Sequence, residues 1–221
     1  KGVVGVNQPV KLMALKFLGE FGYGTLEAGA AALRYAADSG ARVINNSWGA
    51  PRSSIVDDAV AYAASKNVLV VSAAGNNNSD ASWFSPAGAP DSMAIAAYGV
   101  GDSRASFSNY GTKIDVAAPG VDVLSTRSFQ NNICSASRLV GTKHCRLSGT
   151  SMASPHVAGL AALILAKNPA FTATEVRQII RTSAEDLGTP GFDTDSGQGM
   201  IDANKALTVN NVLFPIITSP S

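Results

Sequence analysis

Hydrophobic positions repeat with a helical period in three parts of the chain. Between residues 26 and 39, Ala28, Ala31, Ala32, Tyr35 and Ala36 fall on one side of a helix, and Gly40 supplies the stop. A second helix is predicted over residues 55–66, where Asn67 caps the end. A third follows Thr172, because Glu175 three residues later completes a capping box and Val176 to Ser183 provides an apolar face.

Uninterrupted apolar runs mark the strands between these helices. They predict strands over residues 10–18, 42–47, 68–73 and 121–126. The resulting alternation of strand and helix indicates right-handed crossovers and an α/β fold. We expect three layers, with a doubly wound, mostly parallel sheet and helices on both of its faces. Ligands of such sheets bind at the carboxyl ends of the strands.

The segment before the apolar stretch 160–166 carries the most distinctive chemistry. Residues 147–159 read Leu-Ser-Gly-Thr-Ser-Met-Ala-Ser-Pro-His-Val-Ala-Gly. Gly149 and Thr150 suit a tight turn, and Pro155 is tolerated early in a helix, so Ser151 is predicted at a helix N-terminus. Unpaired N–H groups there favour developing negative charge. The alternative is an ordinary serine cap on a buried helix.

Read as a whole, Gly-Thr-Ser-Met-Ala-Ser-Pro-His-Val-Ala-Gly resembles the nucleophile motif of the subtilisin family of serine proteases. The resemblance extends over roughly residues 2–207. It implies a catalytic domain over residues 1–207, followed by a tail over residues 208–221, and an endopeptidase that hydrolyses peptide bonds through an acyl-enzyme on Ser151. It also implies that the N-terminal strands of the family's sheet are missing from this sequence.

A second family segment, Ala-Ala-Gly-Asn, ends the strand at residue 73 and places Asn76 as the side-chain donor of an oxyanion hole. The alternative is a turn residue in an ordinary Asn-rich loop. By the same resemblance, the pocket for the residue before the scissile bond is walled by Ser47, Trp48, Gly49, Ala73, Ala74 and Gly75. Gly22, Tyr23 and Gly24 would pair with the substrate as an added strand. Trp48 is larger than the usual residue, and we expect it to narrow or cover the pocket.

Residues 76–115 are similar to the proteinase K branch of the family. The resemblance implies a structural calcium ion held by the carboxylate of Asp115 and the backbone carbonyls of Pro90 and Ser92. Oxygen ligands suit this hard cation, and water would complete its shell. The alternative is a surface carboxylate without a metal. No organic cofactor is expected.

Charge and cysteine content bear on whether the protein binds nucleic acid or membranes and on where it is located. The formal net charge is +1, which gives no indication of nucleic-acid or acidic-membrane binding, and no apolar run approaches the roughly 20 residues that span a bilayer. Cys134 and Cys145 are close enough to close a small loop as a disulfide, with two free thiols as the alternative. Together with family habit, the cysteine pair leads us to expect a secreted, extracellular protein.

The sequence provides no obvious general base for Ser151. In the family an Asp and then a His precede the serine, yet only His144 and His156 occur. His156 lies five positions after Ser151, about 140° around the helix, and His144 lies in the cysteine loop. We therefore expect both partners in an upstream segment that this sequence lacks.

Two further possibilities stay open for the function of the chain. One is a catalytically silent relative that binds extended peptides, and the other is an unrelated hydrolase, although Ala153 breaks the Gly-x-Ser-x-Gly pattern. The expected partners are protein or peptide substrates and the missing N-terminal segment or a prosegment. The complete protein is expected to be a monomer. Without the absent strands, we expect the isolated chain to fold poorly or aggregate.

Overall fold

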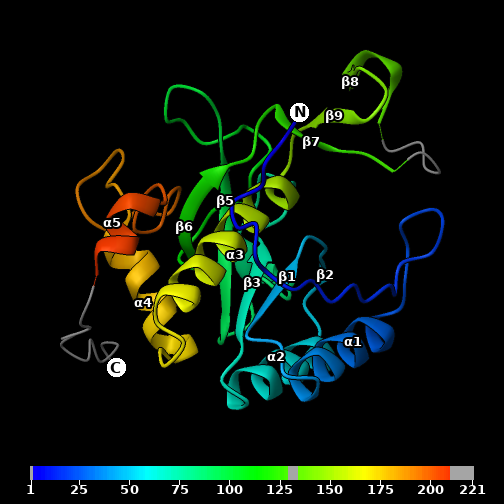
Figure 1. Cartoon of the computed structure of the whole chain (residues 1–221), viewed down its shortest axis with the longest axis vertical. Coiled ribbons are helices and arrows are strands. Elements are labelled where there is room, and N and C mark those ends of the chain that lie inside the picture. The colour runs from blue at the N-terminus through cyan, green and yellow to red at the C-terminus, as the bar shows by residue number, and fades with distance from the viewer. Residues whose placement is uncertain (1, 129–133, 210–221) are drawn as a thin grey trace.

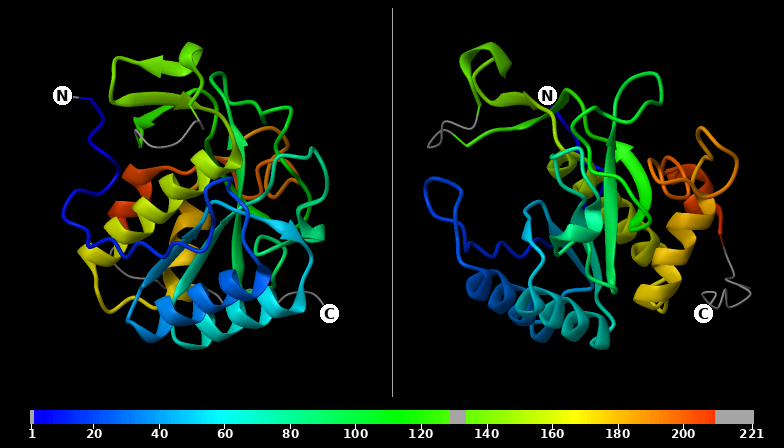
Figure 2. Two further views of the ribbon diagram at one scale, coloured as in Figure 1. Left: turned by 90° about the vertical axis from the view of Figure 1, so that its right-hand side faces the viewer. Right: turned by 180° about the vertical axis from the view of Figure 1, so that it is seen from behind.

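The centre of the molecule is a four-stranded parallel sheet with helices on both faces (Figure 1, Figure 2). The structure, a computed structural model, describes residues 2–128 and 134–209. Along the sheet the strands follow the order β1 (Val43–Asn46), β3 (Leu69–Ala73), β5 (Ser92–Tyr98) and β6 (Ile114–Pro119). The predicted three-layer α/β fold is confirmed, and so are the strands that the sequence placed at residues 42–47 and 68–73.

One face of the sheet is covered by α1 (Leu26–Asp38) and α2 (Ser54–Ser65). Thr25 caps α1 by accepting a hydrogen bond from the N–H of Ala28, and Gly40 follows its end with φ of 82°. The helix is confirmed, but its predicted face is wrong, because Gly29, Ala30, Leu33, Ala36 and Ala37 are buried while Tyr35 is 59% exposed. Small alanines fit several faces, so the large apolar side chains Leu26 and Leu33, which pack in the same core cluster, set the orientation.

The opposite face carries α3 (Thr150–Lys167), α4 (Ala173–Ser183) and α5 (Ala203–Thr208). The predicted capping box is present, since Thr172 and Glu175 bond to each other's backbone N–H. Helix α3 is apolar on nearly every side because it lies between the sheet and α4 (Figure 1). Strand β3 joins the two cores: Val71 faces α3 while Val70 faces α2, and neither is exposed to solvent.

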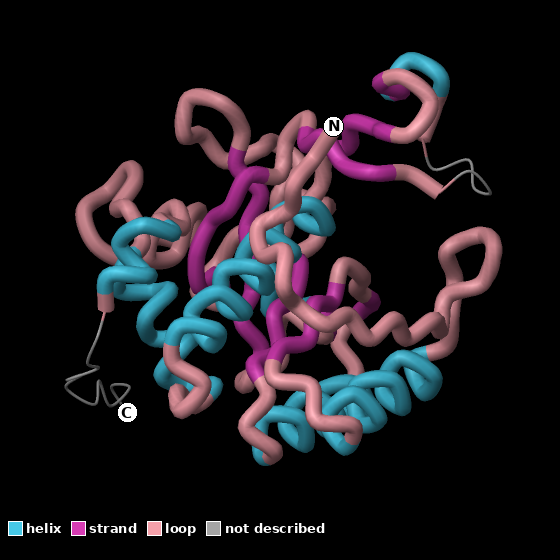
Figure 3. The backbone as a smooth tube through the Cα atoms, in the orientation of Figure 1, coloured by secondary structure: helices cyan, strands magenta, loops and turns pink. Residues whose placement is uncertain are grey.

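A three-stranded antiparallel sheet projects from the body beside the N-terminal end of α3 (Figure 3). It consists of β7 (Val123–Thr126), β8 (Leu139–Val140) and β9 (His144–Leu147), with the 3-10 turn η2 (Ala136–Arg138). We call its described residues, 123–128 and 134–147, the arm. Cys134 and Cys145 form a disulfide with a Cα–Cα distance of 6.2 Å, which confirms the predicted bridge. A small sheet of β2 (Ala50–Pro51) and β4 (Phe84–Ser85) and the turn η1 (Ala81–Trp83) complete the described elements.

The predicted strand at residues 10–18 is wrong. These residues run along the molecule without strand pairing, and Leu12 is 90% exposed. In the described structure β1 is an outer strand that pairs only with β3. An apolar run predicts burial, but a strand also needs a neighbour in register. Here Phe17, near the end of the run, packs on the body against Trp48 without any strand pairing. Of the predicted tail, residues 210–221 lie outside the described residues.

Candidate active site

Ser151 occupies the first turn of α3, at the carboxyl edge of the sheet. Gly149 is the N-cap, and Ser151 is the second helical residue. Its hydroxyl donates to the backbone carbonyl of Ser47, with 3.1 Å between Oγ and O. The helix N-terminus therefore lies directly beneath this hydroxyl, where the partial positive charge favours an anion.

The side chain of Asn76 is held in one orientation by Thr150. Oδ1 of Asn76 accepts from the Thr150 backbone N at 2.9 Å and from Thr150 Oγ1 at 3.0 Å. Thr150 Oγ1 in turn accepts from the N–H of Gly75 at 3.1 Å. Because Oδ1 is engaged in these bonds, the amide nitrogen Nδ2 is the group left to donate.

This amide nitrogen borders the same space as the backbone N of Ser151. A Cβ atom placed on Gly149 would lie 3.5 Å from Nδ2 of Asn76 and 3.7 Å from the N of Ser151. Two N–H donors that border one small space are the arrangement that an oxyanion requires. The structure thus brings together the two residues that the sequence placed in this role.

Asn109 holds the Asn76 loop in place, a role that the sequence reasoning missed. It is fully buried, its Oδ1 accepts from the N–H groups of Asn77 and Ser79, and its Nδ2 donates to the carbonyl of Ala74. Gly75 has φ of +108°, and a Cβ there would lie 2.3 Å from Nδ2 of Asn109. The one sequence signal for this role is weak: Asn109 lies between the aromatic residues Phe107 and Tyr110.

A second network, also missed, joins α3 to the end of β1. The hydroxyl of Ser47 donates to the Ser151 carbonyl at 2.8 Å and lies 3.2 Å from Ser154 Oγ. Ser154 is fully buried and donates to Oδ1 of Asn45 at 2.8 Å. The first turn of α3 is therefore fixed to the strand that the sequence assigned to substrate binding.

Trp48 does not lie on the α3 side of this strand. Successive side chains of an extended segment alternate between faces, so Ser47 faces α3 while Trp48 faces α1. The Trp48 ring packs on Gly29 and lies 4.9 Å from the Phe17 ring, and its Nε1 donates to Asn46 Oδ1 at 3.0 Å. The expectation that Trp48 covers the pocket therefore does not fit this geometry.

The remaining predicted substrate-binding residues lie in two parts of the structure, near the ends of β1 and β3 and in an exposed turn before α1. Ala73 and Ala74 are buried at the end of β3, and Gly49 is exposed. Gly22, Tyr23 and Gly24 lie in an exposed turn, where Gly22 has φ of 78° and the Tyr23 carbonyl already accepts from the N–H of Gly19 at 2.8 Å. This segment is not an extended strand in the structure, so the predicted strand pairing there would require the turn to open.

Neither histidine hydrogen-bonds to Ser151 in the described part of the chain. Nδ1 of His156 lies 2.8 Å from the carbonyl oxygen of Met152, which can only accept, so this ring is occupied within α3. The ring of His144 in β9 packs against the backbone of Gly2. Among the described residues, the site therefore combines the Ser151 hydroxyl with two neighbouring N–H donors, and neither histidine is bonded to that hydroxyl.

Asp115, the carboxylate predicted to hold calcium with the carbonyls of Pro90 and Ser92, is already paired within the protein. Asp115 is 4% exposed, and Arg177 binds it in a two-pronged pair: Nε lies 3.0 Å from Oδ1 and Nη2 lies 3.0 Å from Oδ2. The N–H of Ala94 donates to Oδ2 at 3.0 Å, and Nε of Arg181 lies 3.7 Å from Oδ1. Two guanidinium groups already neutralise this carboxylate, so an added cation would be repelled.

No other metal site is evident within residues 2–128 and 134–209, where no group of three or more His, Cys, Asp or Glu side chains could hold an ion. Beside Asp115, burial lowers the pKa of Lys113, and the nearby Arg177 lowers it further. This cluster of cations around one carboxylate joins β6 to α4.

Comparison with known proteins agrees with this geometry. The chain is 41% identical over 208 residues to the thermophilic serine proteinase of Bacillus sp. strain AK1, covering 94% of this chain and 48% of that protein. It is 38% identical over 206 residues to Subtilisin BL of Lederbergia lenta, covering 93% and 71%. The chain thus spans about half the length of the first relative.

Solved structures give the same assignment. A protease of Pseudoalteromonas arctica PAMC 21717 superposes with a TM-score of 0.81 at 34% identity, covering 94% of this chain and 65% of that one. A cold adapted subtilisin-like serine proteinase gives a TM-score of 0.71 at 31% identity, covering 85% and 63%. Since residues 1–199 also match the sequence pattern described as the Subtilase family, the chain belongs to the subtilase family of serine proteases.

Proposed function

We propose that the protein is a serine endopeptidase in which Ser151 is the nucleophile. The observation that carries this proposal is the convergence of Asn76 Nδ2 and Ser151 N on the space beside Gly149. Oγ of Ser151 would attack the scissile carbonyl carbon, and the carbonyl oxygen would become an anion stabilised by these two donors. Collapse breaks the C–N bond, the amine leaves with the proton that the general base took from Ser151, and the remaining acyl-enzyme is hydrolysed by water.

The proton of Ser151 must leave as the bond to carbon forms. In the structure this proton is donated to the Ser47 carbonyl, which cannot act as a base at neutral pH. We therefore assign the general base to a His, and the carboxylate that orients it to an Asp, both in a polypeptide segment outside these 221 residues. The oxyanion site is independent of that segment, because every contact that orients Asn76 comes from described residues.

A peptide-binding protein without catalysis is the second candidate. The bond from Ser151 Oγ to the Ser47 carbonyl favours it, since this hydroxyl is held by an acceptor and not activated by a base. Such a protein would grip an extended chain with the backbone of residues 47–49 and would leave it intact.

The disulfide and the hydropathy of the helices indicate where the protein would act in either case. A bridge such as Cys134–Cys145 persists in oxidising compartments, which supports secretion. None of the described helices has both the length and the hydropathy needed to cross a membrane. The substrates would be proteins or peptides, with a prosegment or the upstream segment as a further partner of the chain.

Fluorophosphonate labelling separates the two candidates. The probe phosphonylates Oγ only where the serine is activated, so we expect Ser151 to be labelled when the upstream segment is added, and Ser151→Ala to remain unlabelled. Peptide mapping locates the adduct. Absence of labelling with the segment present, together with retained binding of an extended peptide, would establish the binding protein instead.

A further inference from the structure

The arm concentrates positive charge that the overall composition conceals. No Asp or Glu occurs between Asp122 and Glu175, and residues 123–147 contain four basic residues: Arg127, Arg138, Lys143 and Arg146. The rest of the chain has 13 basic and 16 acidic residues, a charge of −3. A net charge of +1 therefore divides into a basic arm and an acidic body.

The arm is fixed at its base beside Ser151. Strand β9 ends at Leu147, and the N–H of Gly149 donates to the carbonyl of Gly120 at 2.8 Å. The N–H of Asp122 donates to Ser148 Oγ at 2.9 Å. A hollow of about 460 Å³ adjoins this base, lined by residues 99–100, 103–107 and 121–122. A polypeptide attached at Ser151 would therefore pass close to the arm.

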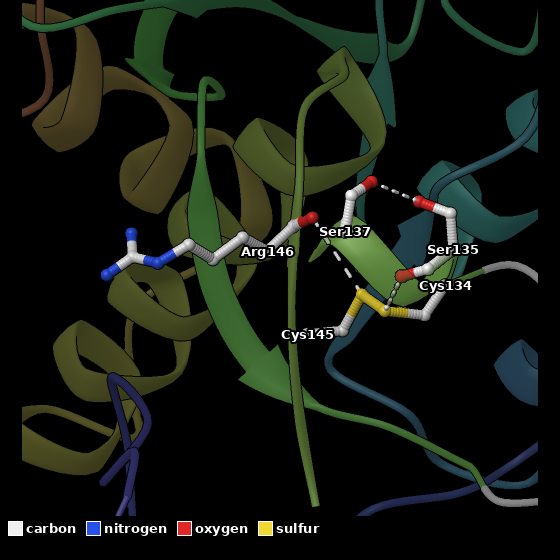
Figure 4. The surroundings of a disulfide bond; sticks show 5 residues. All are labelled: Cys134, Ser135, Ser137, Cys145 and Arg146. Atoms are coloured by element: carbon white, nitrogen blue, oxygen red, sulfur yellow. Dashed lines mark hydrogen bonds between the residues drawn. A yellow bond between two sulfur atoms is a disulfide. The ribbon is translucent and has the colours of Figure 1, made fainter. Parts of the chain in front are cut away.

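The four basic residues differ in how far they can respond to a partner. Arg146 is pinned by Asp122, with 2.9 Å between Nη1 and Oδ2, and Figure 4 shows its side chain pointing away from the disulfide. Arg138 and Lys143 are exposed, and no ion pair among the described residues includes either of them. These two side chains, near the disulfide-closed end, carry the charge that a partner would meet.

The fold of the arm favours a polypeptide over a nucleic acid. β7 and β8 are the outer strands of the arm sheet, so their free backbone groups can pair with an extended chain. Single-stranded nucleic acids are bound by stacking bases on aromatic rings, and the described arm residues include no Phe, Tyr or Trp. The disulfide to Cys134 holds β9 in place, so the charges are presented on an ordered surface.

From these observations we propose that the arm is a docking surface for acidic polypeptide segments, with Arg138 and Lys143 as the contacting cations. The inference rests on the proposed function, in that the acidic segment belongs to the substrate chain that reaches Ser151. Electrostatic complementarity of exposed groups accelerates association and selects partners. Acidic substrates would thus be preferred by contacts outside the reacting centre.

The test is direct binding of matched peptides to the Ser151→Ala variant, measured with the upstream segment added. Two fluorescent 12-residue peptides are compared: one has Glu at four positions, and the other has Gln at the same four positions. At low salt we expect the Glu peptide to bind about 10-fold more tightly, a preference that falls in 0.3 M NaCl as the charges are screened. Binding is measured without hydrolysis, so a failure of the proposed catalytic function would leave this result readable.

A matched pair of variants locates the effect. The double variant Arg138→Gln/Lys143→Gln should reduce the preference for the Glu peptide by about 3- to 10-fold. Arg34→Gln/Lys205→Gln removes the same charge from α1 and α5 and should leave the preference unchanged. Equal binding of the two peptides, an equal loss in both double variants, or displacement of the Glu peptide by single-stranded DNA at equal charge would overturn the proposal.

Discussion

At the scale of single residues, the candidate site depends on which way one amide points. Thr150 supplies two donors to Oδ1 of Asn76, so exchanging the amide oxygen and nitrogen would break both hydrogen bonds. Each such bond contributes about 1 kcal/mol, and a buried donor left unpaired costs more. The orientation that exposes Nδ2 beside Ser151 is therefore built into the ground state, and needs no substrate to induce it.

Asn76→Asp tests this orientation, because aspartate keeps the acceptor for Thr150 and loses the donor. In labelling-competent protein we expect turnover of a peptide substrate to fall by about 10² to 10³, a magnitude taken from the corresponding loss of a subtilisin asparagine. The melting temperature should change little. Thr150→Ser, which retains the hydroxyl, is the control, and unchanged turnover in Asn76→Asp would show that Nδ2 takes no part.

Gly149→Ala tests the space between the two donors. A Cβ there would lie 3.5 to 3.7 Å from its nearest neighbours, ordinary contact distances, so packing allows it, although φ of +156° favours glycine. The methyl group would stand where the substrate oxygen must enter. We expect a folded protein whose rate of acylation falls more than its binding of peptide. A variant with full acylation would place the oxyanion elsewhere.

Lys113 links stability to pH. Burial and Arg177 lower its pKa below 10.5, so the folded protein binds this proton less tightly than the unfolded chain. The free energy of unfolding should therefore rise with pH as Lys113 loses its proton. Above pH 10 Tyr98 opposes this trend, since burial raises its pKa. Between pH 8 and 10, denaturant melts should show the rise in the wild type and in Lys205→Met, but not in Lys113→Met.

At the scale of elements, an ion pair takes the place that the family resemblance gave to calcium. Arg177 of α4 and Asp115 of β6 meet across the core, and Arg181 of the next turn adds a second cation. No sequence pattern predicts this ion pair, because 62 residues separate the two partners. Asp115 lies in β6 with 4% exposure, so its charge needs compensation, and the compensating group could be identified only from the packing of α4.

Removing Arg177 tests how much the Asp115–Arg177 pair contributes to the free energy of unfolding. In Arg177→Met the buried Asp115 keeps Arg181 and the N–H of Ala94, so we expect a loss of about 3 kcal/mol in the free energy of unfolding. Arg34→Met, at an exposed position of α1, should cost less than about 1 kcal/mol. Chelation by EDTA should leave the wild-type melting temperature unchanged. A large EDTA-dependent shift that Asp115→Asn abolishes would restore the calcium site.

The parts of the fold that sequence predicted share a local signal. α4 has its capping box at Thr172, and β3 is an apolar run that alternates between two buried faces. Residues 10–18 carry an equally strong apolar signal, yet they form no strand because no described neighbour pairs with them. Likewise Ser151 and Asn76 could be found from motifs, whereas Asn109 and Ser154 act through contacts between distant segments that only the folded structure defines.

At the scale of the whole molecule, one side of the sheet is left open. β1 is an outer strand of the described sheet. The segment beside it exposes large apolar side chains: Val4, Leu12, Met13, Phe21 and Tyr23. Open strand edges and contiguous apolar surface promote association between copies.

We therefore expect the purified chain to associate in a concentration-dependent manner in sedimentation velocity. Leu12→Glu, which places a charge at a 90% exposed position, should weaken the association, whereas Thr112→Glu, at an exposed polar position, should not. Adding the upstream segment should yield a monomer. A monomeric chain with a cooperative melt in the absence of that segment would show that the open edge is harmless.

In the proposed reaction, Ser151 attacks a carbonyl whose oxygen enters the space between Asn76 Nδ2 and Ser151 N. The most direct test is an acid-quenched reaction of the complemented protein with a slowly deacylating ester, followed by intact mass and peptide mapping. We predict a single acyl group on Ser151, formed much more slowly in Asn76→Asp and absent in Ser151→Ala. An acyl group on any other residue, or equal rates of acylation in wild type and Asn76→Asp, would contradict the account.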